Sequence, residues 1–419
     1  MKNVLVKFGS MARRHSSADG TLNSVDSVSV RANVVEQQVV RLKAADEARK
    51  AREERLAALN PFCIDATLVE CLSDGQGSVE DKVKAFKLLT QCGLKSIILA
   101  AFVKERTPDL KFLQAMRSQK LIDEHCLAFS ELFDANGSDL PGQDLPFGLA
   151  KMIQFGIQNA ILECDLAAPY INWNKYSTED FCALVESRCR WVAANLFAGR
   201  SVPPASFVHL RDFATAMQVA PQRVLELVQY LGRLEPGIRP QGILIHEPAS
   251  GHFPFEAAPY VAAVRAVMDA TGWTEPPQQA GGTLSAAGSG LLLVHVTAGY
   301  GLAHATVLEC LAAGCNGVMA SLCEEAEPAS VHASSLLDLV NLSRLGNPHV
   351  AAHFNMDQLR AAAQEVSAMV LRAQREADKT AEREAAQQAQ QQQQQQQAKP
   401  PTASTSPSHS RQPLILGHA

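Results

Sequence analysis

Short apolar runs recur along the middle of the chain, and longer stretches with helical spacing follow most of them. Eight runs have the length of a strand: FCIDATL, KSIILAAF, CLAF, NAILEC, SFVHL, GILIH, LLLVHV and GVMASL. A run of four to eight apolar residues between turn signals is typical of a buried strand, whereas apolar residues at every third and fourth position indicate an amphipathic helix. The pattern predicts eight strands that alternate with helices.

The stretch VEDKVKAFKLLTQCG illustrates the helical spacing. Ser78 can cap its start, Val83, Phe86 and Leu89 form an apolar stripe, and Gly93 ends it. Buried parallel strands joined by such helices, repeated eight times over about 310 residues, fit a (β/α)8 TIM barrel of the α/β class. An open doubly wound sheet is the alternative fold. It would need a GxGxxG loop after the first strand, and the loop ECLSDGQGSVED lacks that spacing.

The segments before the barrel differ from it in composition. Residues 1–33 are basic and serine-rich at the start, with no acid before Asp19, and are expected to be disordered or to be an organelle transit segment. Residues 34–60 include KAADEARKAREERL, where charges alternate in sign at helical spacing. This pattern predicts a solvated charged helix, with a role as a lid or dimer helix.

The predicted barrel domain covers residues 61–372, and a helix end with a low-complexity tail covers 373–419. From Ala385 the composition turns to Gln, Ala, Ser and Pro, including an unbroken run from Gln390 to Gln397. Such a segment buries too little apolar surface to offset its ordering entropy. A disordered Gln-rich tail is therefore expected.

Composition excludes several classes of protein. The chain has 419 residues, 47% of them hydrophobic, with 38 basic and 43 acidic side chains and a net charge of −5. The chain lacks the basic excess that would indicate a nucleic-acid partner. It also lacks the run of 18 apolar residues that would indicate a membrane span. The ten cysteines include no CxxC pair, which argues against a zinc ribbon or disulfide scaffold and for buried reduced thiols. The expected partner is a small-molecule substrate, in the cytoplasm or in mitochondria.

Polar residues gather where the predicted strands end, which is the active face of a TIM barrel. A carboxylate and a histidine that converge there could hold a divalent cation. Ordinary solvated loop ends are the alternative. The strand-end residues are Asp65, Glu70, Glu131, Glu163, Asp165, Arg211, Asp212, His246, Glu247, His295, Thr297, Cys323, Glu324 and Glu325.

Three segments resemble one enzyme superfamily. IDATLVECLS with GLKSIILAAFV is similar to the opening of the DRE-TIM metallolyases, which include 3-hydroxy-3-methylglutaryl-CoA (HMG-CoA) lyase, isopropylmalate synthase, homocitrate synthase and pyruvate carboxyltransferase-type domains. HVTAGYGLAHATVLECLAAGCNGV resembles their histidine signature, and FVHLRDFATAMQVAP resembles another of their strands. The resemblance implies a TIM barrel that makes or breaks a C–C bond next to a carbonyl, with a divalent cation (Mg, Mn or Zn).

The resemblance also implies a ligand set. Glu70 stands at the metal-binding acid and His295 at the first metal-binding histidine, whereas Thr297 replaces the second histidine. His332, in SVHAS, could supply a nitrogen if its loop is shifted by one residue. Glu70, His295 and His332 are therefore the predicted metal ligands, of the His2Glu type.

Two positions depart from the superfamily pattern. Val69 replaces the arginine that stabilises an enolate oxygen, and Ile98 replaces an acid of the second strand. Removing one preorganised donor to a developing oxyanion typically costs about 100- to 1000-fold in rate. The loss of these groups favours a second hypothesis, a pseudoenzyme whose barrel is a ligand-binding or assembly module.

Four further residues are predicted to be catalytic. His246 and Glu247 could form a replacement acid/base pair, although neighbours in a strand point to opposite faces. Asp212 keeps its match to the superfamily strand, and Tyr300 falls where the lyases also have Tyr. Cys323 lies near the position of a mobile catalytic cysteine, with a packed, inert thiol as the alternative. If active, the enzyme is expected to act on a 2-oxo acid or acyl-CoA by aldol or Claisen chemistry, and a homodimer is one option for its assembly.

Overall fold

The computed structural model describes a set of ranges that covers most of the chain. These are residues 24–72, 77–103, 106, 108–132, 146–169, 171–196, 206–247, 252–274, 290–297, 301–323 and 332–398. Tyr300, Glu324 and Glu325 lie outside them, as do residues 1–23 and 399–419 of the expected disordered ends. The chain divides into two compact units, Met1–Arg55 and Leu56–Ala419.

Eight parallel strands form a closed barrel in the second unit. The strands pair in sequence order, and β8 closes the ring on β1. Their bounds are β1 Phe62–Asp65, β2 Ser96–Phe102, β3 Cys126–Glu131, β4 Asn159–Cys164, β5 Ser206–Leu210, β6 Gly242–Glu247, β7 Leu291–Val296 and β8 Gly317–Ala320. All eight predicted strands are present, the (β/α)8 prediction is confirmed, and the open-sheet alternative is wrong.

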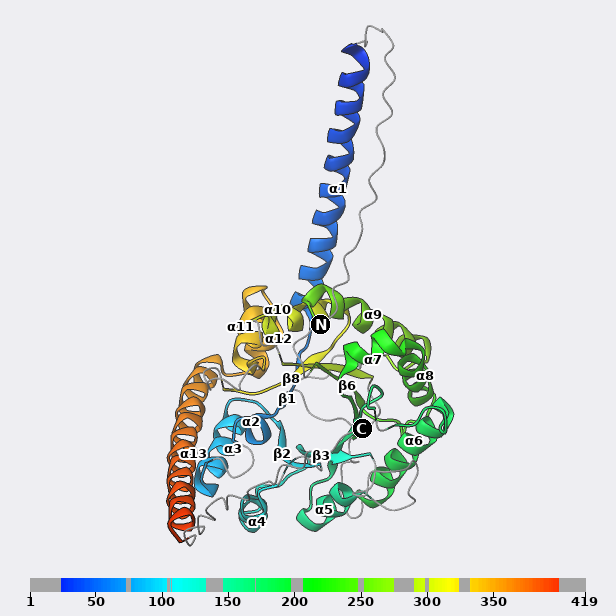
Figure 1. The fold of residues 1–419 in the computed structure, drawn as a ribbon. Coiled ribbons are helices and arrows are strands. Elements are labelled where there is room, and N and C mark those ends of the chain that lie inside the picture. Colours follow the sequence, from blue (N-terminus) through cyan, green and yellow to red (C-terminus); the bar gives the residue numbers. More distant parts are fainter. Residues whose placement is uncertain are drawn as a thin grey trace, which may run out of the picture. The chain divides into compact units, whose positions relative to one another are not determined.

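Helices surround the ring of strands (Figure 1). Those of the barrel unit are α2 Thr67–Glu70, α3 Val79–Gln91, α4 Leu110–Ser118, α5 Phe147–Phe155, α6 Thr178–Asn195, α7 Phe213–Val219, α8 Pro221–Gly232, α9 Pro254–Ala270, α10 Ala303–Ala313, α11 Ser335–Arg344, α12 Pro348–His353 and α13 Met356–Ala398. The α3 prediction is confirmed at both ends. Ser78 Oγ accepts a hydrogen bond from the Asp81 amide at 3.0 Å. Gly93 has a φ of +97°, and a Cβ there would lie 2.5 Å from the His353 carbonyl oxygen, so only glycine fits.

Helix α1 spans Ser24–Ala58, so it begins ten residues before the predicted charged helix. Arg49 bridges Asp46 at 2.6 Å and Glu53 at 2.7 Å, and Lys50 bridges Asp46 at 3.0 Å. These pairs are the three- and four-residue spacings that the alternating charges indicated. The helix is exposed along most of its described side chains, as a solvated helix should be.

Two apolar layers hold the barrel together. Alternate strand residues such as Phe62 and Ile64 fill the inner cluster, and their neighbour Cys63 packs in the outer cluster beneath the helices. This alternation follows from the two-residue period of a strand. All ten cysteines are buried thiols, as predicted.

Helix α13 continues beyond the barrel through Ala398 and includes the glutamine run. Residues 385–398, which the sequence placed in the disordered tail, are therefore helical. Gln and Ala are both good helix formers, and adding residues to an existing helix avoids the cost of nucleation. Within the described ranges, no helix combines the length and the apolarity that a membrane crossing requires.

Candidate active site

Strand periodicity brings three histidines to the inside of the barrel. Phe207, Leu244 and Leu293 belong to the inner cluster on β5, β6 and β7. A residue two positions later points to the same side of its strand, and on each of these strands that residue is a histidine. The three are His209, His246 and His295.

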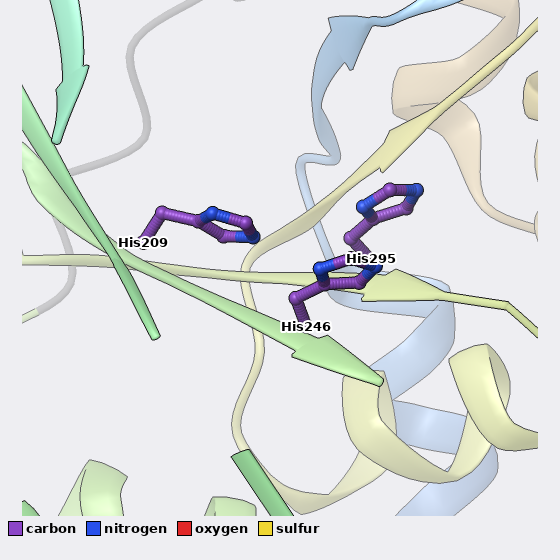
Figure 2. Close-up of side chains that lie close together, drawn as sticks. All are labelled: His209, His246 and His295. Atoms are coloured by element: carbon purple, nitrogen blue, oxygen red, sulfur yellow. The ribbon is translucent and has the colours of Figure 1, made fainter. Parts of the chain in front are cut away.

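The imidazole rings form a row across neighbouring strands. The ring centroids of His209 and His246 are 5.0 Å apart, those of His246 and His295 are 4.3 Å apart, and those of His295 and His332 are 5.0 Å apart. Figure 2 shows His209 extending from β5 toward the neighbouring rings of His246 and His295. His332 joins the row from an isolated bridge to Thr297 beyond the end of β7.

A buried turn after β1 presents Glu70. Asp65 accepts hydrogen bonds from the Thr67 amide at 3.0 Å and the Thr67 hydroxyl at 3.1 Å, and the same hydroxyl accepts one from the Leu322 amide at 2.8 Å. This network fixes the start of α2, whose last residue is Glu70. Asp65 is therefore occupied by the turn, and burial raises its pKa to about 7.

The three predicted metal ligands lie together. Glu70 Oε1 is 3.0 Å from His295 Nε2, His295 Nε2 is 3.1 Å from His332 Nδ1, and His332 Nδ1 is 3.8 Å from Glu70 Oε2. When two donor atoms each lie about 2.0–2.2 Å from a metal ion and their bonds to it form a right angle, the two donors are about 3.0 Å apart. Glu70 Oε2 is buried without a hydrogen-bond partner. These residues therefore fit a small divalent cation.

Thr297, which stands where the superfamily has its second histidine, takes part differently. Its hydroxyl lies 3.1 Å from His332 Nδ1. The antiparallel bridge between these two residues brings His332 beside Thr297, with its Nδ1 3.1 Å from His295 Nε2.

Burial and neighbouring charges set the protonation of this cluster. Burial alone would raise the pKa of Glu70, but His295 and His332 lower it overall to about 2. Burial lowers the pKa of His246 well below the usual imidazole value, and it also lowers the pKa values of His209 and His332. At neutral pH the Glu70 carboxylate is therefore ionised, and the imidazoles of His209, His246 and His332 are neutral. These are the forms of the two groups that bind metal ions.

A cavity of about 100 Å³ opens beside the cluster. Two cations line it, Arg106 and Arg211. Arg106 donates to the Val69 carbonyl oxygen at 2.5 Å, and Arg211 donates to Glu163 Oε1 at 3.0 Å. Glu70 and Glu163 also line the cavity, so its two guanidinium groups face two carboxylates.

The opposite wall of the cavity is apolar. Ala101, Val103 and Phe129 line it. Val69 and Ile98, the two departures from the superfamily pattern, are 4% and 0% exposed and pack in the inner cluster. Neither position offers a polar group to the cavity.

The predicted acid/base pair is divided between two environments. His246 faces the other imidazoles, whereas Glu247 accepts a hydrogen bond from the Ala214 amide at 2.6 Å and lies 2.9 Å from His252 Nδ1. Burial raises the pKa of Glu247 against the opposing effect of these two partners. The structure therefore does not bring His246 and Glu247 together as a pair, because consecutive strand residues point to opposite faces.

Asp212 and Cys323 are not among the described residues that line the cavity. Asp212 stands at the start of α7 with a left-handed backbone, φ +50°. Cys323 is 2% exposed and packs in the outer cluster, with its Sγ 3.7 Å from Ser367 Oγ and with Cys71 as a hydrogen-bonding neighbour. The catalytic roles predicted for both residues stay predictions.

Two residues of the cavity escaped the sequence analysis. The sequence pattern could have indicated His209. In each of SFVH, ILIH and LLVH, a histidine follows at least two apolar residues near the end of a strand. Arg106 had none, since it lies in the loop after β2 and reaches the cavity only through the fold. Arg211 and Glu163 were noted as strand-end residues without a role.

Comparison with known proteins shows similarity in fold. No protein-family model matches the sequence, and no curated protein matches it. The HMG-CoA lyase of Brucella melitensis is 13% identical at a TM-score of 0.50, over 74% of this chain and 99% of that one. The HMG-CoA lyase of Pseudomonas aeruginosa is 14% identical at a TM-score of 0.51, and the match covers 75% of this chain and 93% of that one. The carboxyl transferase domain of Rhizobium etli pyruvate carboxylase was solved with pyruvate and biocytin. It is 14% identical at a TM-score of 0.51, and the match covers 77% of this chain and 49% of that one.

These solved structures are of kinds that the sequence motifs indicated, HMG-CoA lyase and a pyruvate carboxyltransferase-type domain. The resemblance is thus confirmed for the fold, an aldolase-type TIM barrel. At such low identity, a shared fold carries no residue roles or activity with it. Those depend on the site itself.

Proposed function

We propose that this protein is a diverged aldolase-type lyase that acts on a C–C bond next to a carbonyl in a small carboxylate or acyl thioester substrate. The observation that carries the proposal is the meeting of Glu70, His295 and His332 within 3.8 Å of one another at the mouth of the barrel. Their sequence positions are far apart, and only two of them match the motif that suggested the reaction.

The residues around the ligands support this chemistry. A divalent cation held by Glu70, His295 and His332 would act as a Lewis acid toward a substrate carbonyl. Arg106 and Arg211 are placed to bind an anionic group of the substrate, and the apolar wall of Ala101 and Phe129 excludes water and strengthens these interactions. The missing arginine at Val69 is not replaced in kind, so the proposed rate enhancement is lower than that of an enzyme with the full set.

The metal part of this proposal is tested by titrating the chelator-treated full chain with Mn²⁺ and following the loss of the free-ion EPR signal. We expect Glu70→Gln and His332→Asn each to weaken binding by more than about 100-fold, because each removes one of three ligands. His353→Asn, which removes a partly exposed histidine of α12, is the matched control and should bind as the wild type does. Mn²⁺ binding that survives both ligand variants would contradict the assignment.

The reaction is tested with a panel of 3-hydroxyacyl-CoA thioesters and of 2-oxo acids with a 4-hydroxyl group. Release of acetyl-CoA or of a smaller 2-oxo acid is measured with and without Mn²⁺. We expect activity that depends on the metal and is lost in Glu70→Gln. Activity that is indifferent to metal and to both ligand variants would contradict the proposed site.

A pseudoenzyme is the second candidate function, and a specific observation favours it. Val69 and Ile98 are packed in the inner apolar cluster, so the positions that the superfamily uses for an arginine and an acid have become part of the core. This candidate predicts binding of a small anion in the cavity without turnover of any compound in the panel. Isothermal titration with pyruvate, acetoacetate and coenzyme A, compared between wild type and Arg211→Gln, separates it from the lyase.

A further inference from the structure

Three imidazoles lie together beside the proposed cation site, and that site uses only one of them. Ring nitrogens of His209, His246 and His295 lie within 4.8 Å of one another. They come from three adjacent strands, β5, β6 and β7, and His246 and His295 are direct partners in the strand register. The barrel framework therefore positions all three rings, rather than a loop (Figure 2).

The nitrogens of this cluster are buried and lack partners. His209 and His295 are each 2% exposed. Nε2 of His209, both ring nitrogens of His246, and Nδ1 of His295 have no hydrogen-bond partner. Buried polar atoms in a folded protein are almost always hydrogen-bonded, so several unpartnered nitrogens in one place indicate that the partner is a ligand.

The kind of donor selects the kind of ligand. Three imidazoles without a carboxylate suit zinc, cobalt, nickel or copper, whereas magnesium and calcium prefer oxygen donors. Three protein nitrogens with an open fourth position are also the arrangement of many zinc sites that react with small molecules. The cavity beside His209, His246 and His295 provides that open position.

Carboxylates stand behind two of the three rings. Glu163 Oε2 lies 3.7 Å from His209 Nδ1, and Arg211 holds the other oxygen of Glu163 at 3.0 Å. Glu70 Oε1 lies 3.0 Å from His295 Nε2, the nitrogen opposite the unpartnered Nδ1. A carboxylate on the far nitrogen of a ligating histidine fixes its tautomer and makes it a better donor.

We infer that His209, His246 and His295 form a three-imidazole site for a transition metal ion of the zinc class. The site shares His295 with the Glu70 and His332 set but uses neither of those residues as a ligand. This inference goes beyond the proposed lyase function and does not depend on it.

The test measures Zn²⁺ affinity of the full chain by competition with a chromophoric chelator. We expect His209→Asn and His246→Asn each to weaken Zn²⁺ binding by more than about 100-fold, which exceeds the usual effect of losing only an orienting partner. His332→Asn should stay within about threefold of the wild type, because it removes a ligand of the other set only. His353→Asn is the control for adventitious binding by the partly exposed histidines of α12.

Three outcomes would overturn the inference. One is wild-type Zn²⁺ affinity in both His209→Asn and His246→Asn. Another is an equal loss in His332→Asn, which would place the ion on the Glu70 set. If His246→Asn abolishes turnover while Zn²⁺ affinity is unchanged, His246 is a proton-transfer group and the site is again wrong.

A spectroscopic measurement on the wild-type protein tests the same site even if the His209 and His246 variants fail to fold. The EPR spectrum of the Cu²⁺-loaded wild type should show coupling to three nitrogens, and the spectrum of His332→Asn should show the same number. Coupling to fewer than three nitrogens overturns the site. These results are independent of Mn²⁺ binding and lyase activity, so a failure of the proposed function leaves them interpretable.

Discussion

Strands β2 and β3 present Ala101 and Phe129 to the barrel mouth, with Val103 just beyond β2, whereas β5, β6 and β7 present imidazoles at the same level. The apolar side cannot bind an ion or move a proton. The imidazole side has more nitrogen donors than its own hydrogen bonds occupy. The two sides of one cavity therefore carry separate tasks.

Burial of His209 and His246 disfavours their charged forms and is the main reason that their pKa values are lowered. Neutral imidazoles remain available as ligands near pH 7. Val69 and Ile98 pack in the inner apolar cluster and add no polar side chain near these donors.

The largest effect is expected from placing an acid on the apolar side. Ile98→Asp restores the acid of the superfamily at a position that is 0% exposed. We expect the free energy of unfolding to fall by about 3–5 kcal/mol, because the carboxylate is buried without a partner. Urea unfolding followed by circular dichroism measures it.

The control for that experiment is Ile98→Val, which removes one methyl group and should cost only about 0.5–1.5 kcal/mol. Burial raises the pKa of the new carboxyl group in the folded state, so its destabilising effect should shrink as the pH is lowered toward its ordinary value. A loss that is the same for both substitutions at neutral pH would show that this side tolerates charge.

A smaller effect is expected from Glu163→Gln on the imidazole side. Burial raises the pKa of Glu163, but His209 and Arg211 lower it overall to about 2. Its ionised form therefore stabilises the folded protein above the ordinary glutamate pKa. The free energy of unfolding of the variant should be lower than that of the wild type by about 1–2 kcal/mol at pH 7. The loss should not be larger, because Arg211 is 36% exposed and solvent screens its interaction with Glu163.

The pH dependence checks the origin of that loss. The contribution of Glu163 disappears as the pH falls from about 4.5 through about 2, so the difference in unfolding free energy between wild type and Glu163→Gln should narrow over that interval. Urea unfolding at several pH values measures it. A difference that stays constant below pH 4.5 would assign the effect to packing instead of charge.

The smallest effect on stability is expected from His246→Phe. The substitution keeps an aromatic ring in the stack with His295 and removes two buried nitrogens that have no partner. Because unpaired buried polar atoms are destabilising, the metal-free variant should be as stable as the wild type or up to about 1 kcal/mol more stable. If the three-imidazole site binds Zn²⁺, the wild type should gain a rise in melting temperature on adding Zn²⁺, and this variant should lack it. A marked loss of stability would show that the imidazole has a structural partner.

Strand and helix periodicity was sufficient to predict the eight-stranded barrel, the cap at Ser78 and the stop at Gly93. These features depend on interactions between residues close in the chain and on one repeated unit. The two-residue period of a strand also predicted that His246 and Glu247 face opposite ways, whereas the ligand set of Glu70, His295 and His332 came from the resemblance to the metallolyases. Composition placed residues 385–398 in a disordered tail, because it measures the apolar surface available for burial and does not register the growth of an existing helix.

Only the closed barrel decided which of the strand-end residues meet. Its register aligns His246 with His295 and brings His209 beside them, and a bridge to Thr297 carries His332 to the same place. Arg106 reaches the cavity from a loop. Donor atoms must approach within a few ångströms to share a ligand, and separations that small depend on strand pairing and side-chain packing across the whole domain, which no local sequence pattern specifies.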